Sequence, residues 1–425
     1  MGDVRSPDRR PALAFVFPGQ GGQWDRMGRD LLRDEPVFAA AIAACDEAMR
    51  RWVDWSVRDE LLRPEATSRL DNIEFIQPAT FAIQVALAAL WASWGIVPDA
   101  VVGQSMGEIA AAHVAGALSL DDASRVICHQ GRLLGRLSGK GAMAVVELSR
   151  SEAEAAIAGR TDVLSLAGSN GPSSSVLSGE PVALNRVLER LDDDGVFHRL
   201  LRVDVAPHGP QMDSVRDELL ALLDGLAPRA ADTPIYSTVT AQPCSGETLD
   251  ANYWARNLRE PFRFAETIAL MAAHDHTVFV EISPHPILSG AILEAQQAGA
   301  GHLVVLPSLE RDMDAREVLL GSLAELDKRG FPVTWPQVRP TDVIAAHLRS
   351  MIADVLRRPA DELSIDSRLS SEGLDSIRAA AVRTRIQLGF GVRVPMLALL
   401  RGTIAGLAVR VLQATDVPAP PDSDA

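Results

Sequence analysis

A serine at a predicted sharp turn is the first feature of this sequence that could do chemistry. Residues 103–107 are GQSMG, which fits the pattern G-x-S-x-G. An apolar stretch precedes them and a helix-forming stretch of small residues follows, so the sequence predicts a strand, a turn and a helix, with Ser105 exposed above a sheet edge. A plain Gly-Ser turn is the competing interpretation. A hydroxyl in that place can act as a nucleophile once a base accepts its proton.

The nine histidines of the chain are the candidates for the base that accepts the serine proton. His274 and His276 lie in an exposed-looking AAHDHT, and His198 lies within a predicted strand. His208 follows the end of a predicted strand, in VDVAPHGPQMD. The carboxyl ends of strands in α/β sheets collect functional residues, so His208 is the strongest candidate.

A serine that attacks a carbonyl also needs N–H groups to stabilise the oxyanion that forms. The turn GQGGQ, after a predicted strand, can offer the N–H of Gln20, and the residue after the serine, Met106, can offer another. A glycine-rich turn can also hold phosphate, but this one lacks the lysine of a P-loop. The three cysteines are scattered, and no cluster of side chains indicates a metal.

The elements that must position these residues alternate between strand and helix along most of the chain. Residues 142–205 predict the order βαββαβ, which is typical of a ferredoxin-like subdomain. Before and after it, strands alternate with helices and predict a mainly parallel sheet with both faces covered. The expected fold is therefore an α/β, hydrolase-like body with an inserted ferredoxin-like subdomain.

A change of composition near GFPVTWPQVRP marks a short stiff connector, after which short helices predict a small bundle. The expected division is a disordered tail (1–11), the α/β body (12–310), a C-terminal wrap and linker (311–340), the helical bundle (341–413) and a second disordered tail (414–425).

The composition of this 425-residue chain argues against some classes of binding partner. Its net charge of −15 argues against a nucleic-acid backbone or an anionic membrane as partner. The N-terminus MGDVRSPDRR lacks the apolar region of a signal peptide, and scattered cysteines suit a reducing compartment, so we expect a cytoplasmic protein. The apolar run PATFAIQVALAALWASWGIV contains polar residues and predicts a buried core helix instead of a membrane span.

Several motifs together resemble the acyltransferase domains of modular polyketide synthases, which are related to malonyl-CoA:acyl carrier protein transacylases. They include FVFPGQGGQW, GQSMGEIAAAHVAGAL, NGPSS, VDVAPHGPQMD, YWARNLREPFRF and FVEISPHPIL, in order between about residues 12 and 338. The resemblance implies that Ser105 carries the acyl group and that His208 is its base. It further implies that the backbone carbonyl of Asn257 orients the imidazole and that Gln20 and Met106 form the oxyanion hole.

The C-terminal bundle resembles an acyl carrier protein. The motif GLDSI matches the attachment motif, which implies that a phosphopantetheinyl transferase adds 4′-phosphopantetheine to Ser376. A simple helix N-cap is the alternative for this serine. Residues 341–415 hold ten arginines against seven carboxylates, a balance of about +3, whereas many carriers are acidic.

Two positions depart from the family pattern. Gln104 stands where the family commonly has histidine, and glutamine also suits a residue that packs and hydrogen-bonds there. Gln130 stands where extender-unit acyltransferases place the arginine that binds the free carboxylate of malonyl or methylmalonyl groups. An amide cannot supply that charge, so Gln130 indicates a monocarboxylic acyl group, unless Arg125 or Arg132 substitutes.

The same resemblance places VAPH, residues 205–208, in the substrate pocket. Val205 is smaller than the aromatic residue that relatives often have there, and with Ala206 and Pro207 it leaves room near the acyl α-carbon. A branched or longer acyl group is therefore one hypothesis.

Taken together, we expect a loading didomain that moves a monocarboxylic starter from acyl-CoA, through an acyl-serine, to its own carrier domain, ahead of a downstream ketosynthase. Four alternatives remain: an extender acyltransferase, transfer from another carrier protein, a thioester hydrolase, and a carrier or docking protein with an inactive transferase domain. The sequence does not name the acyl group, the final product or the oligomeric state.

Overall fold

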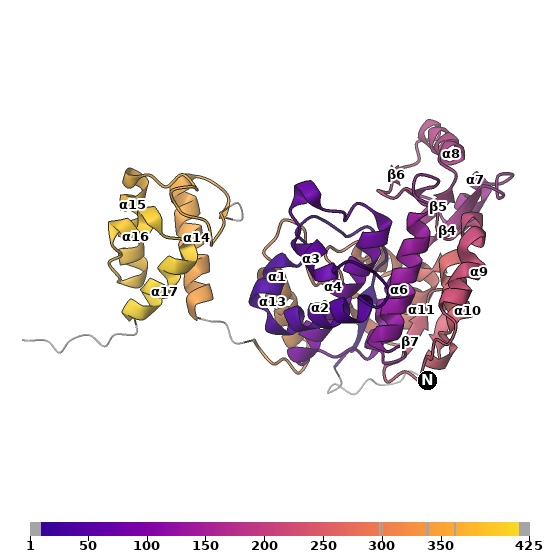
Figure 1. Cartoon of the computed structure of the whole chain (residues 1–425), viewed down its shortest axis with the longest axis horizontal. Helices are drawn as coiled ribbons and strands as arrows, with labels where there is room; N and C mark the ends of the chain where they lie inside the picture. Colours follow the sequence, from indigo (N-terminus) through magenta and orange to yellow (C-terminus); the bar gives the residue numbers. More distant parts are fainter. Residues whose placement is uncertain (1–9, 297–298, 300, 337–339, 361–362, 416–425) are drawn as a thin grey trace, which may run out of the picture. The chain divides into compact units, whose positions relative to one another are not determined.

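The computed structural model describes residues 10–296, 299, 301–336, 340–360 and 363–415 (Figure 1). The chain divides into two compact units, Met1–Thr334 and Trp335–Ala425, each of which is described by itself. The boundary falls inside the predicted connector, although part of the stretch predicted as wrap and linker forms a helix of the first unit. The predicted tails lie largely outside the described residues.

A six-stranded sheet carries the first unit, with its strands in the order β11-β10-β1-β2-β7-β8. Every neighbouring pair is parallel except β7 with β8. The central strands are continuous apolar runs because both faces of the sheet are covered. This confirms the mainly parallel body. The strands are β1 (Ala12–Phe17), β2 (Ala100–Gly103), β7 (Ile235–Ser237), β8 (Gln242–Cys244), β10 (His276–Glu281) and β11 (Val304–Pro307).

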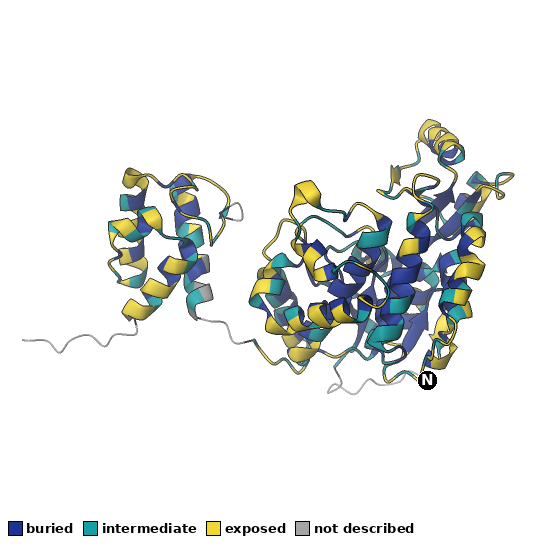
Figure 2. Cartoon of the chain, in the orientation of Figure 1, coloured by how far each residue is buried: buried dark blue, intermediate teal, exposed yellow. Residues whose placement is uncertain are grey.

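Helices cover this sheet, and buried residues make up most of the strands and part of each covering helix (Figure 2). They are α1 (Arg29–Asp34), α2 (Pro36–Met49), α3 (Val57–Leu62), α4 (Ile73–Ser93), α5 (Gly107–Val114), α6 (Leu120–Gly135), α9 (Asp213–Leu222), α10 (Ala251–Arg259), α11 (Phe264–Ala273), α12 (Ser289–Ala295) and α13 (Ala315–Asp327), with short 3₁₀ turns η1 (Glu65–Thr67), η2 (Pro210–Met212) and η3 (Gly246–Thr248).

Helix α4 is the predicted core helix. Within the described part of the chain it alone is long and apolar enough to cross a membrane, yet most of it is buried inside the protein. It packs against both α2 and α6. The indole N–H of Trp91, near its C-terminal end, donates to Ser308 Oγ at 2.9 Å. These contacts are those of a helix buried in a protein core.

A second sheet holds the predicted ferredoxin-like subdomain. Its strands lie in the order β6-β3-β5-β4-β9, and the first four are antiparallel neighbours joined in the predicted βαββαβ sequence. A two-residue strand from outside the predicted subdomain pairs in parallel with its edge. The last strand of the subdomain is short, because the chain leaves the sheet after Leu200 and runs to His208. The elements are β3 (Ala142–Val146), α7 (Arg150–Ala156), β4 (Leu164–Gly171), β5 (Ser174–Gly179), α8 (Pro181–Asp193), β6 (His198–Leu200) and β9 (Phe262–Arg263).

The second unit is the predicted small helical bundle. Its helices are α14 (Pro340–Leu356), α15 (Ser376–Phe390), α16 (Met396–Arg401) and α17 (Ile404–Thr415). Leu348, Ile352, Val382 and Ile386 are fully buried in its own apolar core. A unit with a separate core of this kind can carry its attachment serine on an independent scaffold.

Candidate active site

Ser105 lies at the predicted sharp turn between β2 and α5. Its backbone φ is +54°, in the left-handed region that a side chain with a Cβ rarely adopts. The flanking glycines permit this turn, since a Cβ on Gly103 would lie 2.2 Å from the backbone nitrogen of Glu108, and one on Gly107 would lie 2.0 Å from the carbonyl oxygen of Phe17. The G-x-S-x-G pattern is thus a steric requirement of the turn that presents the hydroxyl.

His208 meets this serine across 103 residues of sequence. Its Nε2 lies 2.8 Å from Ser105 Oγ, so the hydroxyl can donate its proton directly to the ring. His208 also has a positive φ, +58°, and is only 2% exposed. Two strained residues that face each other in this way are typical of a functional site.

Helix α10 holds the histidine through its C-terminal carbonyl groups. The backbone N–H of His208 donates to the carbonyl of Leu258 at 2.9 Å, and Nδ1 lies 2.9 Å from the carbonyl oxygen of Glu260. The Nδ1 contact requires the tautomer with its proton on Nδ1, which leaves Nε2 free to accept the serine proton. The edge of the ring packs against Phe262, with centroids 5.4 Å apart.

The resemblance implies that the carbonyl of Asn257 orients this ring, and in the structure the carbonyl of Glu260 shares that role and makes the closer contact with Nδ1. Helix α10 ends at Arg259, and Glu260, in extended backbone after the last turn, turns its carbonyl toward the ring. Asn257 contributes through its side chain as well, because Nδ2 donates to the carbonyl of Ser105 at 3.3 Å. Its own carbonyl also favours the protonated imidazole, but less than that of Glu260 does.

Burial controls the charge of His208. It lowers the pKa of the imidazole from 6.5 to about 4, against the opposing effect of the carbonyls of Glu260 and Asn257. The ring is therefore neutral at neutral pH and is available as a base.

The two turns predicted to form an oxyanion hole lie against each other. A Cβ on Gly19 would lie 3.4 Å from Ser105 Cβ and 3.2 Å from the carbonyl oxygen of Gln104, so the turn after β1 touches the nucleophile turn. Gln20 is the next residue of that turn. Met106 precedes the first residue of α5, where helix N–H groups have no partner within the helix.

Gln104 is buried and joins the neighbouring turns. Its Oε1 accepts from the N–H of Gly19 at 3.4 Å, and its Nε2 donates to Asn170 Oδ1. Glutamine at this position thus makes contacts on both sides of its amide.

The segment that precedes His208 is largely buried as well. Val205 and Ala206 are buried, and the carbonyl of Pro207 accepts from Ser178 Oγ at 2.7 Å. These contacts fix the backbone that leads into the histidine.

Gln130 lies in α6, 1% exposed, in the tight contact with α4. Its Nε2 donates to Gln77 Oε1 at 3.2 Å, so two neutral amides face each other there. No sequence pattern pairs Gln77 with Gln130, because Gln77 is 53 residues away, just before the apolar run that begins at Pro78.

Neither neighbouring arginine replaces the missing charge. Arg125 donates to the carbonyls of Leu222 and Asp224 at 2.9 and 2.8 Å and stacks on Trp52, while Arg132 is exposed. Within the described part of the chain, no arginine or lysine is among the buried residues.

Ser376 is exposed at the first position of α15. The N-cap is its neighbour Asp375, whose carboxylate accepts from the N–H groups of Ile377 and Arg378 at 2.9 and 2.8 Å. Since Asp375 caps the helix, the Ser376 hydroxyl is not needed for that role. The arrangement fits a serine that is accessible to covalent modification.

The two units match two known families. Residues 14–332 match the acyl transferase domain family and residues 346–411 the phosphopantetheine attachment site family. The first match covers about three quarters of the sequence, so the chain belongs to the acyl transferase domain family. More narrowly, it is an acyltransferase domain of the polyketide synthase type, followed by a domain that matches the phosphopantetheine attachment site family.

Its relatives are large synthases. The chain is 45% identical over 341 residues to polyketide synthase GfsB of Streptomyces halstedii, covering 80% of this chain but 6% of that protein. It is 44% identical over 330 residues to erythronolide synthase EryA2 of Saccharopolyspora erythraea, covering 77% of this chain and 9% of that protein. The chain therefore spans only a small part of these relatives.

Solved structures share the fold of the first unit. The acyltransferase domain from module 8 of the salinomycin polyketide synthase is 43% identical, with a TM-score of 0.75 over 77% of this chain and 78% of that one. A loading acyltransferase from the avermectin modular polyketide synthase is 38% identical, with a TM-score of 0.71 over 74% of this chain and all of that one.

Proposed function

We propose that this chain loads a monocarboxylic starter acyl group from acyl-CoA onto its own carrier domain, with Ser105 as nucleophile and His208 as base. The observation that carries the substrate class is the neutral Gln130–Gln77 contact, in a part of the fold where no buried arginine or lysine lies among the described residues. A free carboxylate left there without a partner would cost about 3–5 kcal/mol, or roughly 10²- to 10⁴-fold in discrimination.

Similarity to a loading enzyme supports the same proposal. The avermectin relative, described as a loading acyltransferase, aligns over its whole length. The order of the two matched families, a transferase followed by a carrier, also suits a loading didomain. We place a ketosynthase downstream as the acceptor of the loaded acyl group.

In the first half-reaction the neutral Nε2 of His208 accepts the Ser105 proton as Oγ attacks the thioester carbonyl. The N–H groups of Gln20 and Met106 stabilise the oxyanion. The tetrahedral intermediate collapses when the C–S bond breaks, and His208 returns its proton to the leaving thiolate of CoA. An acyl-Ser105 ester remains on the enzyme.

The second half-reaction needs an acceptor thiol, which phosphopantetheine on Ser376 supplies when a phosphopantetheinyl transferase has attached it. His208 accepts the proton of the attacking thiol, the same N–H groups stabilise the second oxyanion, and Ser105 leaves with the proton of His208. Attachment through a flexible arm to the same chain raises the local concentration of the acceptor to about millimolar.

The proposal is tested by isolating the first half-reaction. Ser376→Ala removes the acceptor, and intact-protein mass then follows acyl addition from propionyl-CoA. We expect one acyl group per chain, located on Ser105 by peptide mapping, and none on a Ser105→Ala/Ser376→Ala double variant. Unchanged labelling in the double variant would contradict the assignment of the nucleophile.

A further inference from the structure

A buried carboxylate on α5 is not used by the acyl-transfer steps above. Glu108 lies in the first turn of α5, three residues after Ser105, and is 3% exposed. An acidic residue in a first helical turn commonly interacts with the N–H groups of its own helix. Glu108 instead accepts hydrogen bonds from two other elements.

The first of these elements is the end of β7. Glu108 Oε1 accepts from the backbone N–H of Thr238 at 2.8 Å and also from the Thr238 hydroxyl. Burial raises the pKa of Glu108 to about 7, and the donors around it oppose that rise. A buried acidic group is kept here at the cost of desolvation, which is offset by several hydrogen bonds.

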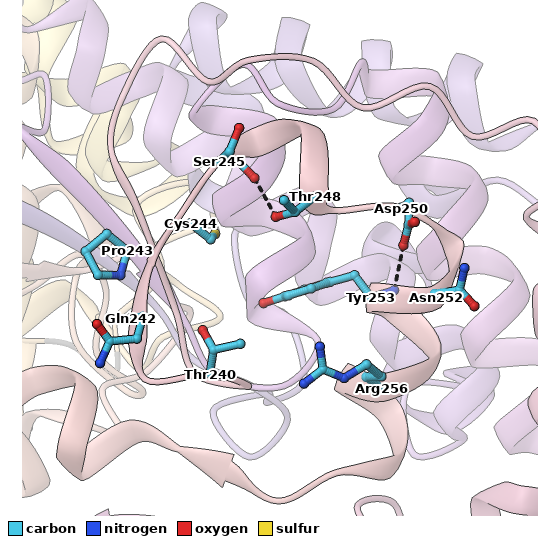
Figure 3. A pocket seen from close by; sticks show the side chains of 10 residues that line it. All are labelled: Thr240, Gln242, Pro243, Cys244, Ser245, Thr248, Asp250, Asn252, Tyr253 and Arg256. Atoms are coloured by element: carbon cyan, nitrogen blue, oxygen red, sulfur yellow. Dashed lines mark hydrogen bonds between the residues drawn. The ribbon is translucent and has the colours of Figure 1, made fainter.

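The second element is α10. Tyr253 donates its hydroxyl proton to Glu108 Oε2, and the hydroxyl also lies 2.7 Å from Ser237 Oγ. Tyr253 lines a pocket of about 470 Å³, and Figure 3 shows its side chain extending from α10 among the other lining residues. In the same view Asp250 caps the helix by accepting from the N–H of Tyr253, at 2.9 Å.

Tyr253 and Asn257 are one turn apart and share a face of α10. The first is tied to Glu108, and the second donates to the carbonyl of Ser105 at 3.3 Å. Helix α10 is thus joined both to α5, at Glu108, and to the turn that precedes α5, at Ser105. Beyond these points, the carbonyls of Leu258 and Glu260 hold His208.

We infer that Glu108 and Tyr253 are positioning residues, which fix α10 against α5 and thereby set the distance between Ser105 and His208. This inference rests on the proposed Ser105–His208 dyad. A shift of α10 by a fraction of an ångström would lengthen the contact between Oγ and Nε2. A misplacement of about 1 Å can cost roughly 100-fold in rate, and a smaller shift costs correspondingly less.

The test measures how reactive Ser105 is, independently of acyl-CoA binding. Phenylmethanesulfonyl fluoride is added to the full chain, and intact mass follows loss of fluoride as the serine sulfonyl ester forms. Tyr253→Phe keeps the ring and removes the tie to Glu108. Tyr236→Phe is the matched control, because Tyr236 is the only other tyrosine and its hydroxyl lies 2.7 Å from His274 Nδ1 instead.

We expect Tyr253→Phe to slow the modification by roughly 10- to 100-fold and to lower kcat for acyl transfer with little change in KM. Tyr236→Phe should react as the wild type does. Glu108→Gln, which can still accept from Thr238 and bond to Tyr253, should retain most of the rate. Equal rates for the two tyrosine variants would overturn the positioning role.

Two further measurements keep the outcomes distinct. Thermal unfolding of each variant identifies a loss of rate that follows only from unfolding, which would overturn the inference. If the wild type is modified no faster than Ser105→Ala, then Ser105 is not an activated nucleophile. That result would contradict the Ser105–His208 dyad, and not only the positioning role of Glu108 and Tyr253.

Discussion

Gln130 on α6 and Gln77 on α4 face each other at 3.2 Å, as donor and acceptor of a hydrogen bond between two buried, uncharged side chains. An arginine in the place of Gln130 would bring a guanidinium into the contact between these two helices. Gln77 Oε1 could accept from one of the five N–H groups of that arginine, and the others would be available to bind a carboxylate. In the proposed function, this neutral pair disfavours acyl groups that carry a free carboxylate.

The first prediction concerns this pair. We expect Gln130→Arg to raise the ratio of methylmalonyl to propionyl loading by roughly 10²-fold or more, because the carboxylate then gains a bidentate partner. Without substrate, the buried cation should lower the unfolding temperature. The ratio is measured from intact mass with both CoA esters present, and Gln130→Leu serves as an uncharged control. A ratio in Gln130→Arg equal to that of the control would contradict the assigned role.

The second prediction concerns pH. Since burial lowers the His208 pKa to about 4, the rate of Ser105 acylation should stay nearly constant from pH 8 to about 5 and fall only below that range. Rapid pH-jump mixing separates this effect from acid unfolding. A decline centred near 6.5, the ordinary histidine value, would show that the base is solvated or is a different residue.

The same pKa shift has a consequence for stability. Between pH 6.5 and about 4 the unfolded chain binds a proton at His208 that the folded chain does not bind. The free energy of unfolding should therefore fall as pH decreases through this window, by about 3 kcal/mol at its lower end. Urea titrations of the wild type and of His208→Gln at several pH values measure this difference.

A third prediction follows from the backbone of the nucleophile. Ser105 is held at a φ of +54°, which strains any residue that has a Cβ. Ser105→Gly relieves this strain and Ser105→Ala keeps it, although glycine loses more entropy on folding. We expect Ser105→Gly to be more stable than Ser105→Ala by about 0.5–1 kcal/mol, with both inactive. Chemical denaturation of the two variants gives the comparison, and equal stabilities would contradict a strained turn.

Much of this fold could be predicted from sequence, for local reasons. The βαββαβ order of the subdomain follows from hydrophobic periodicity, and the nucleophile turn follows from the steric demands of Gly103 and Gly107. Contacts between residues far apart in the sequence could not be predicted. The carbonyl of Glu260 reaches His208 because of where α10 ends, and helix ends are the least predictable part of an element.

Two further partners of the site also depend on tertiary packing. Gln77 faces Gln130 only because α4 and α6 cross at that level. Glu108 was visible next to the serine motif, but its partner Tyr253 is 145 residues away, and no local pattern joins the two. Residues that bear the chemistry could be found by type and spacing, whereas residues that hold them in place required the structure.

One measurement tests the central claim most directly. The chain with phosphopantetheine on Ser376 is offered acetyl-, propionyl-, isobutyryl-, malonyl- and methylmalonyl-CoA separately, and intact mass follows loading, with Ser105→Ala as control. We predict loading from monocarboxylic esters at rates roughly 10²-fold or more above those from the two dicarboxylic esters, and none in the control. Preferred loading of malonyl or methylmalonyl groups would contradict the account and make this chain an extender acyltransferase.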